Sequence, residues 1–339
     1  MPRTILLRDW LNQLFPRQHA EQEISFQPAS ADASFRRYFR VELPDGSTRI
    51  VMDAPPEHED CRPFLKVAAL FRDAGVHVPE VFAEDLDQGF LLLSDLGGTT
   101  YLDALDEETA PRLYRDANAA LVDIQRASRP GVLPDYDRAL LERELMLFPD
   151  WYIARHLDTT LEQKQAAALR AVFEKILANN LAQPPVFVHR DYHSRNLMLL
   201  ENDYPANPGI LDFQDAVFGP ITYDLVSLYR DAYIAWEEEQ ELDFVIRYWE
   251  MARKAGLPVH GDFDLFYRDY EWMGAQRQIK VLGIFARLFH RDGKDGYLKD
   301  MPRVMSYLRR TCQRYNDLKP LAHLLDHLEN RQANVAYTF

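Results

Sequence analysis

Three side chains with the chemistry of phosphoryl transfer lie close together in the chain: Asp191, Asn196 and Asp212. Asp191 and Asn196 belong to the polar stretch H-R-D-Y-H-S-R-N, and Asp212 to the stretch I-L-D-F-Q-D. One carboxylate can orient an attacking hydroxyl and accept its proton, while an amide oxygen and a second carboxylate can hold Mg²⁺ against nucleotide phosphates. These residue types therefore indicate transfer of a phosphoryl group from ATP.

The spacing of these residues is also informative. Asn196 follows Asp191 by five positions and Asp212 follows Asn196 by sixteen, in the order of the catalytic loop and the metal-binding Asp of the protein-kinase signature. A single H-x-D is common, but three elements in this order rarely arise by chance. The alternative, in which polar loop residues merely cap a sheet, is therefore disfavoured.

Short apolar runs flank these residues and must position them. Val186–Val188 and Leu197–Leu200 predict short buried strands, and Ile210–Leu211 predicts a third that ends at Asp212. We expect a hairpin-like unit whose loops present the three polar side chains from a rigid apolar base.

The N-terminal third predicts a sheet with a lid for phosphates. A helix over 3–14 and a strand over 24–27 precede a small polar segment, 30–34, that leads into a strand over 35–43. A turn at 44–46 returns the chain through a strand over 48–52. Small side chains let backbone N–H groups approach phosphate oxygens. Ser34, Arg36 and Arg37 are the candidates for nucleotide binding, and a plain β-hairpin is the alternative.

A Gly-rich link follows the last strand of this region. Helix 63–74 and strands 81–83 and 90–93 lead to S-D-L-G-G at 94–98. Backbone groups at Ser94 and Leu96 could hydrogen-bond an adenine edge if this link is a hinge. An ordinary strand-to-helix loop is the alternative.

The rest of the chain predicts mostly helices. Amphipathic patterns cover 107–125, 138–148, 151–157, 161–181, 223–236, 243–255, 263–291 and 303–328. The pattern predicts an α+β, bilobal, protein kinase-like fold. Its small β-rich N-lobe would span residues 1–95, and its larger, mainly helical C-lobe residues 96–339.

Composition excludes several other classes of protein. The chain has 339 residues, 53 of them acidic and 39 basic, for a net charge of −14, which disfavours nucleic-acid or anionic-membrane binding. The N-terminal residues have no long apolar core, and no apolar run is long enough to span a bilayer. The two cysteines show no metal-ligand spacing. We expect a cytoplasmic monomer that acts on a small molecule.

The catalytic-loop motifs resemble those of the aminoglycoside phosphotransferase and choline-kinase family of small-molecule kinases. Longer stretches along the whole chain resemble bacterial anomeric amino-sugar kinases within that family: S-A-D-A-S-F-R-R-Y-F-R-V, V-M-D-A-P-P-E, L-L-L-S-D-L-G, R-E-L-M-L-F-P-D-W-Y and Q-I-K-V-L-G-I-F-A-R-L. The resemblance implies ATP-dependent phosphorylation of the C1 hydroxyl of N-acetylmuramate and N-acetylglucosamine. The α-1-phosphate product would serve peptidoglycan recycling.

The resemblance also implies residue roles. Asp191 would be the catalytic base, with Asn196 and Asp212 as the Mg²⁺ ligands. His189 is interpreted as a residue that braces the loop, and Asp224 as structural. Asp215 is expected to cap a following helix.

Two features depart from the kinase pattern. The phosphate loop has no glycine, and the strand that usually carries a phosphate-pairing lysine reads V-M-D-A, with Lys66 the first lysine in the chain. We therefore expect Arg36 or Arg37 to neutralise the phosphates.

The sugar site is predicted less sharply. Arg195, His193, Glu144 and Trp151 are the candidate substrate residues, and Gln276, Arg277 and Lys280 mark a further candidate region. A carboxylate on the substrate would favour a cation such as Arg195 or Arg277. Another small-molecule kinase, for an aminoglycoside, choline or another sugar, is the first alternative. An inactive nucleotide-binding module is the second.

Overall fold

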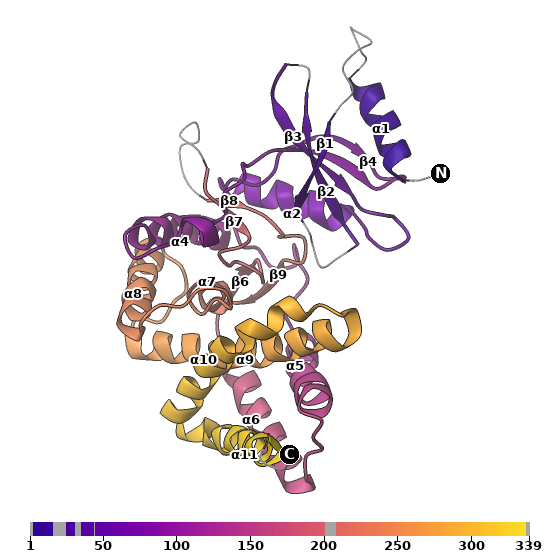
Figure 1. Cartoon of the computed structure of the whole chain (residues 1–339). Coiled ribbons are helices and arrows are strands. Elements are labelled where there is room, and N and C mark those ends of the chain that lie inside the picture. Colours follow the sequence, from indigo (N-terminus) through magenta and orange to yellow (C-terminus); the bar gives the residue numbers. More distant parts are fainter. Residues whose placement is uncertain (1–2, 16–24, 31–34, 44, 201–207, 337–339) are drawn as a thin grey trace. The chain divides into compact units, whose positions relative to one another are not determined.

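The computed structural model describes residues 3–15, 25–30, 35–43, 45–200 and 208–336 (Figure 1). The chain forms two compact units, one of residues 1–99 with 198–215, and one of residues 100–197 with 216–339. The first unit therefore takes up a second, distant segment that carries Asp212. The sequence pattern placed that segment in the C-lobe.

The first unit contains a five-stranded sheet in the order β1-β2-β3-β5-β4, and all its neighbouring strands are antiparallel. This sheet and the helical remainder of the chain confirm the predicted α+β fold. The elements of the sheet and its two helices are α1 (Arg3–Leu14), β1 (Phe26–Ser30), β2 (Arg37–Glu42), β3 (Thr48–Asp53), α2 (Arg62–Asp73), β4 (Val81–Asp85) and β5 (Phe90–Ser94).

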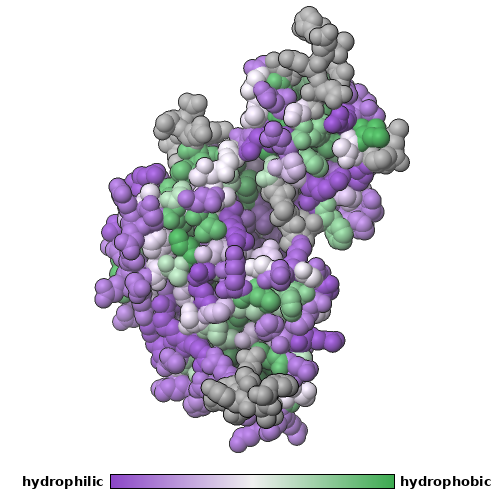
Figure 2. All heavy atoms as spheres, in the orientation of Figure 1, coloured by the Kyte–Doolittle hydropathy of each residue, from purple (hydrophilic) through white to green (hydrophobic). Residues whose placement is uncertain are grey.

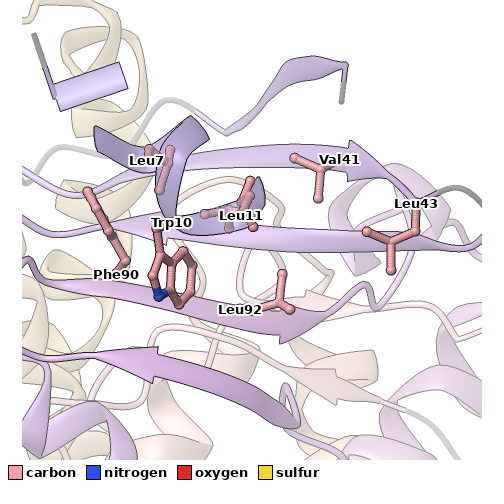
Figure 3. Packing of buried hydrophobic residues seen from close by; sticks show 8 residues of the cluster. Leu7, Trp10, Leu11, Val41, Leu43, Phe90 and Leu92 are labelled. Atoms are coloured by element: carbon pink, nitrogen blue, oxygen red, sulfur yellow. The ribbon is translucent and has the colours of Figure 1, made fainter. Parts of the chain in front are cut away.

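Helix α1 packs on one face of this sheet (Figure 3). Trp10 and Leu11 follow Leu7 by three and four residues, so the three side chains form a single apolar stripe along the helix. The stripe contacts buried strand residues that include Val41 and Phe90. The predicted helix over 3–14 is confirmed, and this contact explains why it forms.

The β2–β3 hairpin sets the position of Arg37. Its register pairs Glu42 with Thr48 and Arg37 with Asp53. Arg37, the first residue of β2, therefore lies opposite Asp53, while Arg36 precedes the strand.

The strands around the catalytic loop pair differently from the expected hairpin. β6 (Pro185–Val188) pairs antiparallel with β9 (Val217–Pro220), and β7 (Leu197–Met198) pairs with β8 (Gly209–Ile210). The hairpin-like prediction is therefore wrong. β7 has only two residues, whereas all four residues of β6 pair with residues of β9.

The second unit is mainly helical, as predicted. Its helices are α3 (Tyr101–Ala104), α4 (Ala110–Arg126), α5 (Arg138–Leu147), η1 (Phe148–His156), α6 (Gln163–Leu181), α7 (Tyr223–Tyr229), α8 (Glu238–Lys254), α9 (Phe263–Asp292), η2 (Asp295–Asp300), α10 (Met301–Arg314), η3 (Asn316–Leu318) and α11 (Lys319–Ala336). Two predictions were too long. The helix that starts at Tyr223 ends at Tyr229, and the helix predicted over 303–328 is interrupted at η3. Asp215 caps no helix, because β9 follows it.

Helix α9 is the central element of the second unit (Figure 1). It packs against α5, α6, α7, α10 and η1. At Gly283 it approaches α5 so closely that a Cβ would lie 2.5 Å from the carbonyl carbon of Leu147. Because α9 is buried through most of its length, polar residues on it must find partners inside the protein or in a ligand.

Hydrophilic residues cover most of the face seen in Figure 2, with smaller hydrophobic patches between them. Among the described helices, none is both long and apolar enough to cross a membrane.

A buried ionic network ties α7, α8, α9 and α10 together. Arg230 is fully buried and donates to Glu241 at 2.6 Å, Glu271 at 3.0 Å and Thr311 at 2.8 Å. Arg310 and Arg314 approach the same two carboxylates from α10. Every charge in the network thus has an opposite partner.

Replacement of Arg230 by Met should destabilise the protein by about 3–5 kcal/mol, because two buried carboxylates would each lose a cation. Urea-induced unfolding measures this change. Arg247→Met, which breaks the exposed pair with Asp243, is the control and should cost no more than about 1 kcal/mol. Equal stability of the two variants would contradict the network's role.

Candidate active site

The catalytic loop begins at His189, directly after β6, and is held by a buried carboxylate on α7. Asp224 accepts hydrogen bonds from the backbone N–H groups of His189 at 2.7 Å and Arg190 at 2.9 Å. Arg190 has φ of 78°, a conformation that costs energy for a residue other than glycine. The two hydrogen bonds stabilise this turn, so the structural role predicted for Asp224 is confirmed. Burial raises the pKa of Asp224 to about 7, although both hydrogen bonds oppose the shift.

The backbone of Asp191 is fixed from several directions. Its N–H donates to Nδ1 of His189 at 3.2 Å, as expected for a residue that braces the loop. Its carbonyl accepts from the side-chain amide of Asn196 at 2.9 Å and from the N–H of His193 at 3.0 Å. The same hydrogen bond orients the Asn196 amide, so the two predicted functional residues position each other.

The Asp191 carboxyl group is ionised at neutral pH. Burial raises its pKa, but the positive charges around it, those of Lys280, Arg277 and Arg190, outweigh burial and lower the pKa to about 2. Such a carboxylate is a weak base but a constant hydrogen-bond acceptor. That suits phosphoryl transfer, in which orientation of the hydroxyl and electrostatic stabilisation supply most of the catalysis.

Glu144 organises the cations beside Asp191. Its carboxylate accepts from Arg190 and Tyr136 and lies 3.2 Å from Nζ of Lys280. Burial raises the pKa of Glu144, but Lys280 and Arg190 more than offset this and keep it ionised. Both of its oxygens are engaged within the protein. Glu144 therefore fits the sugar-contacting role predicted for it poorly and serves to position two cations.

His193 and Arg195 meet on one aromatic ring. The Arg195 guanidinium lies 3.5 Å from the centroid of the Tyr233 ring, and the His193 ring packs edge-on against the same ring. Burial lowers the pKa of His193, which favours its neutral form. Two of the predicted substrate residues are thus brought together.

Trp151 lies on η1 and is half-buried. Within the described part of the chain it forms no hydrogen bond or ring contact. No contact joins it to the other three substrate candidates, so its predicted role stays a prediction.

In the first unit, Asp212 lies just beyond β8 with φ of 60°. Gln214 donates to one of its oxygens at 2.8 Å, and Arg36 approaches the same oxygen at 3.8 Å. Arg36 also lies 3.9 Å from Glu59. A cation is therefore present next to the predicted metal ligand.

Arg37 has a different partner, the fully buried Asp53. Arg37 donates to one oxygen of Asp53, at 3.1 Å from Nε, and Arg3 of α1 donates to the other at 2.8 Å. Asp53 is the last residue of β3, the strand in which protein kinases usually carry a phosphate-pairing lysine. Here it binds two arginines instead. Ser34, the other predicted phosphate-loop residue, lies outside the described residues.

The link after β5 is more strongly fixed than expected. The Ser94 N–H donates to the Glu80 carbonyl at 2.8 Å, so this N–H is not free for an adenine. An adenine contact through the other backbone groups of Ser94 and Leu96 stays a prediction. Its hydroxyl accepts from the Glu80 N–H. Leu96 is buried against Met198, Leu200 and Leu211. Arg40 donates to Asp95 at 2.6 Å and to the Gly97 carbonyl at 2.8 Å.

The donor set suits magnesium. Asn196 carries an amide oxygen and Asp212 a carboxylate, which are kinds of oxygen donor that Mg²⁺ takes in proteins. Among the described residues no group of three or more His, Cys, Asp or Glu could hold a metal ion. The assignment of Asn196 and Asp212 as Mg²⁺ ligands therefore stays a prediction.

The sequence pattern missed Arg190 and Tyr136 as partners of Glu144 and gave Lys280 no specific role. Lys280 is separated from Asp191 by 89 positions, and no local spacing joins them. The Arg37–Asp53 contact could have been predicted from the sequence. Pairing the residues on either side of the turn at residues 44–46, one by one, places Asp53 opposite Arg37.

Comparison of the chain with known proteins identifies its family. The chain matches the phosphotransferase enzyme family over residues 25–257. It belongs to that family, which confirms the predicted class of enzyme.

Two relatives indicate a particular group within the family. The N-acetylmuramate/N-acetylglucosamine kinase of Neisseria meningitidis serogroup B is 49% identical over 344 residues, with both chains fully covered. The kinase of the same name from Pseudomonas aeruginosa is 53% identical over 298 residues, which cover 88% of this chain and 87% of the relative. Among solved structures, a choline kinase from Streptococcus pneumoniae is similar in fold, with a TM-score of 0.61 at 13% identity over 90% of this chain and 98% of the other.

Replacement of Asp224 by Ala should lower the free energy of unfolding by about 2–5 kcal/mol, because two buried N–H groups of the loop would lose their acceptor. Turnover should fall with it, since Arg190 and Asp191 would no longer be held in place. Asp224→Asn keeps one acceptor oxygen, so its losses of stability and of turnover should both be smaller than those of Asp224→Ala. Urea-induced unfolding and steady-state kinetics measure the two effects, and an Ala variant as stable as the native protein would contradict this account.

Proposed function

We propose that this chain is an ATP-dependent anomeric kinase of N-acetylmuramate and N-acetylglucosamine. It would phosphorylate the C1 hydroxyl to give the α-1-phosphate, acting as a cytoplasmic monomer in the recycling of peptidoglycan. The observation that carries the proposal is the identity of about half of all residues, over the full chain, to a kinase with this name. Intact Asp191, Asn196 and Asp212 support it.

Each part of the site has a role in this reaction. The ionised Asp191 would accept a hydrogen bond from the attacking sugar hydroxyl and take its proton as the new bond forms. Asn196 and Asp212 would hold Mg²⁺. When bound, Mg²⁺–ATP supplies the phosphoryl group with its charge partly neutralised. Glu144 keeps Lys280 and Arg190 in place, and these cations keep Asp191 ionised.

The charge around Asp191 weighs against the alternative substrates. An acidic protein could attract a cationic aminoglycoside or choline, but the groups that act on Asp191 include three cations: Lys280, Arg277 and Arg190. Cations at the reacting hydroxyl favour a neutral or anionic acceptor. An inactive binding module would have no need for an ionised carboxylate held in this way.

A coupled assay of ADP release with N-acetylmuramate, N-acetylglucosamine, choline and kanamycin tests the proposal. We expect turnover with the two amino sugars, and NMR of the product should show phosphate at C1. Asp191→Asn should lower kcat by about 10²–10⁴-fold, the usual range for loss of a general base, while nucleotide affinity stays nearly unchanged. Phosphorylation at C6, or turnover with choline or kanamycin alone, would refute the assignment.

We further propose that Arg36 takes the place of the missing strand lysine at the nucleotide phosphates. Its guanidinium lies beside Asp212, and a cation at that position can bind the phosphate oxygens that the metal also contacts. Arg36→Ala should raise the KM for ATP at least about tenfold, the loss expected for a charged hydrogen bond.

Arg37→Ala is the matched control, because Arg37 occupies the next position but binds Asp53. It should lower stability, since Asp53 would keep only Arg3, and should leave the KM for ATP within about twofold. An unchanged KM in Arg36→Ala, or a larger rise in Arg37→Ala, would reject this role for Arg36.

A further inference from the structure

Arg277, in the middle of α9, is a buried cation without an anionic partner. Only 5% of its surface is exposed. Within the described residues it forms no hydrogen bond, and no carboxylate oxygen lies within 4 Å of it; its Nε is fully buried without an acceptor. A buried guanidinium normally carries a paired carboxylate or several acceptors, because its desolvation is costly.

The neighbouring cations are all engaged. Lys280, one helical turn further along α9, donates to the Tyr223 hydroxyl at 2.8 Å and pairs with Glu144. Arg190 also pairs with Glu144. Arg195 is exposed and stacks on Tyr233. Of the four cations around the catalytic loop, Arg277 alone lacks a partner among the described residues.

Arg277 is nevertheless close to the reacting centre. Its charge lowers the pKa of Asp191 and also opposes protonation of His193. Within the part of the chain that the structure describes, the Nδ1 atom of His193 is likewise buried without a hydrogen-bond partner. Two buried polar groups near Asp191, one on α9 and one on the loop after β6, thus have hydrogen-bonding capacity that the described residues do not use.

We propose that Arg277 binds a carboxylate of the acceptor sugar, namely the lactyl carboxylate of N-acetylmuramate, and so strengthens binding of the acidic amino sugar relative to the neutral one. The planar guanidinium offers two parallel donors that match a carboxylate. A bound carboxylate would offset the desolvation cost that Arg277 carries in the unliganded protein. This inference rests on the proposed function and adds a specificity-determining residue to it.

A second role for an unpaired cation near Asp191 would be to bind the transferring phosphoryl group. The two roles differ in what they predict. A contact to the lactyl carboxylate exists only with N-acetylmuramate, whereas a contact to the phosphoryl group exists with either sugar. The relative rates with the two sugars therefore separate them.

The test compares Arg277→Gln and Arg277→Lys with the native enzyme, by measuring kcat and KM for N-acetylmuramate, N-acetylglucosamine and ATP. We expect Arg277→Gln to lower kcat/KM for N-acetylmuramate by about 10–100-fold, mainly through KM, the effect of a lost charged pair. The value for N-acetylglucosamine should stay within about threefold, since that sugar has no carboxylate. Arg277→Lys should recover part of the loss.

Arg268→Gln, an exposed position on the same helix, is the control and should leave both sugars unaffected. Retained activity on N-acetylglucosamine also shows that the Arg277 variants are folded. Equal losses with both sugars, or no loss with N-acetylmuramate, would overturn the role of Arg277 and leave the proposed function standing. A native enzyme that phosphorylates neither sugar would overturn both.

Discussion

The catalytic loop depends on one buried interaction, the acceptance of two backbone N–H groups by the carboxylate of Asp224. Those hydrogen bonds hold Arg190 in a backbone conformation that few non-glycine residues adopt. The side chain of Arg190 contacts Glu144, and the next residue is Asp191, the predicted catalytic base. The position of the predicted base thus depends on a buried carboxylate that holds the backbone before it.

The charge state of Asp191 depends in turn on helix α9. Lys280 and Arg277 lie on it one turn apart and, with Arg190, overcome the effect of burial on the pKa of Asp191. A long helix surrounded by other helices can present charges inside the protein without bending, because its own backbone hydrogen bonds are complete. The same burial makes each charge expensive, so each requires a partner in the protein or in a ligand.

Local patterns predicted what local interactions determine. The spacing of Asp191, Asn196 and Asp212 predicted the class of enzyme, which the family comparison confirms, while the role of each residue stays a prediction. The strands and helices of the first unit follow from alternation and periodicity. The pairing of β6 with β9 and the Glu144–Lys280 contact could not be predicted, because both join segments far apart in the chain. The hairpin register places Arg37 opposite Asp53, whereas the Arg36–Asp212 contact again joins distant segments.

The discontinuity of the first unit has a consequence for how the chain assembles. Residues 198–215 return to a unit that otherwise ends at residue 99, and the fully buried Phe213 packs on Phe64 and Phe71 of α2. During synthesis on the ribosome, the aromatic surface of α2 therefore stays uncovered until Phe213 emerges, 140 residues after the helix ends at Asp73. The first unit cannot be completed as an independent N-terminal domain, because its last segment follows the helices encoded in between.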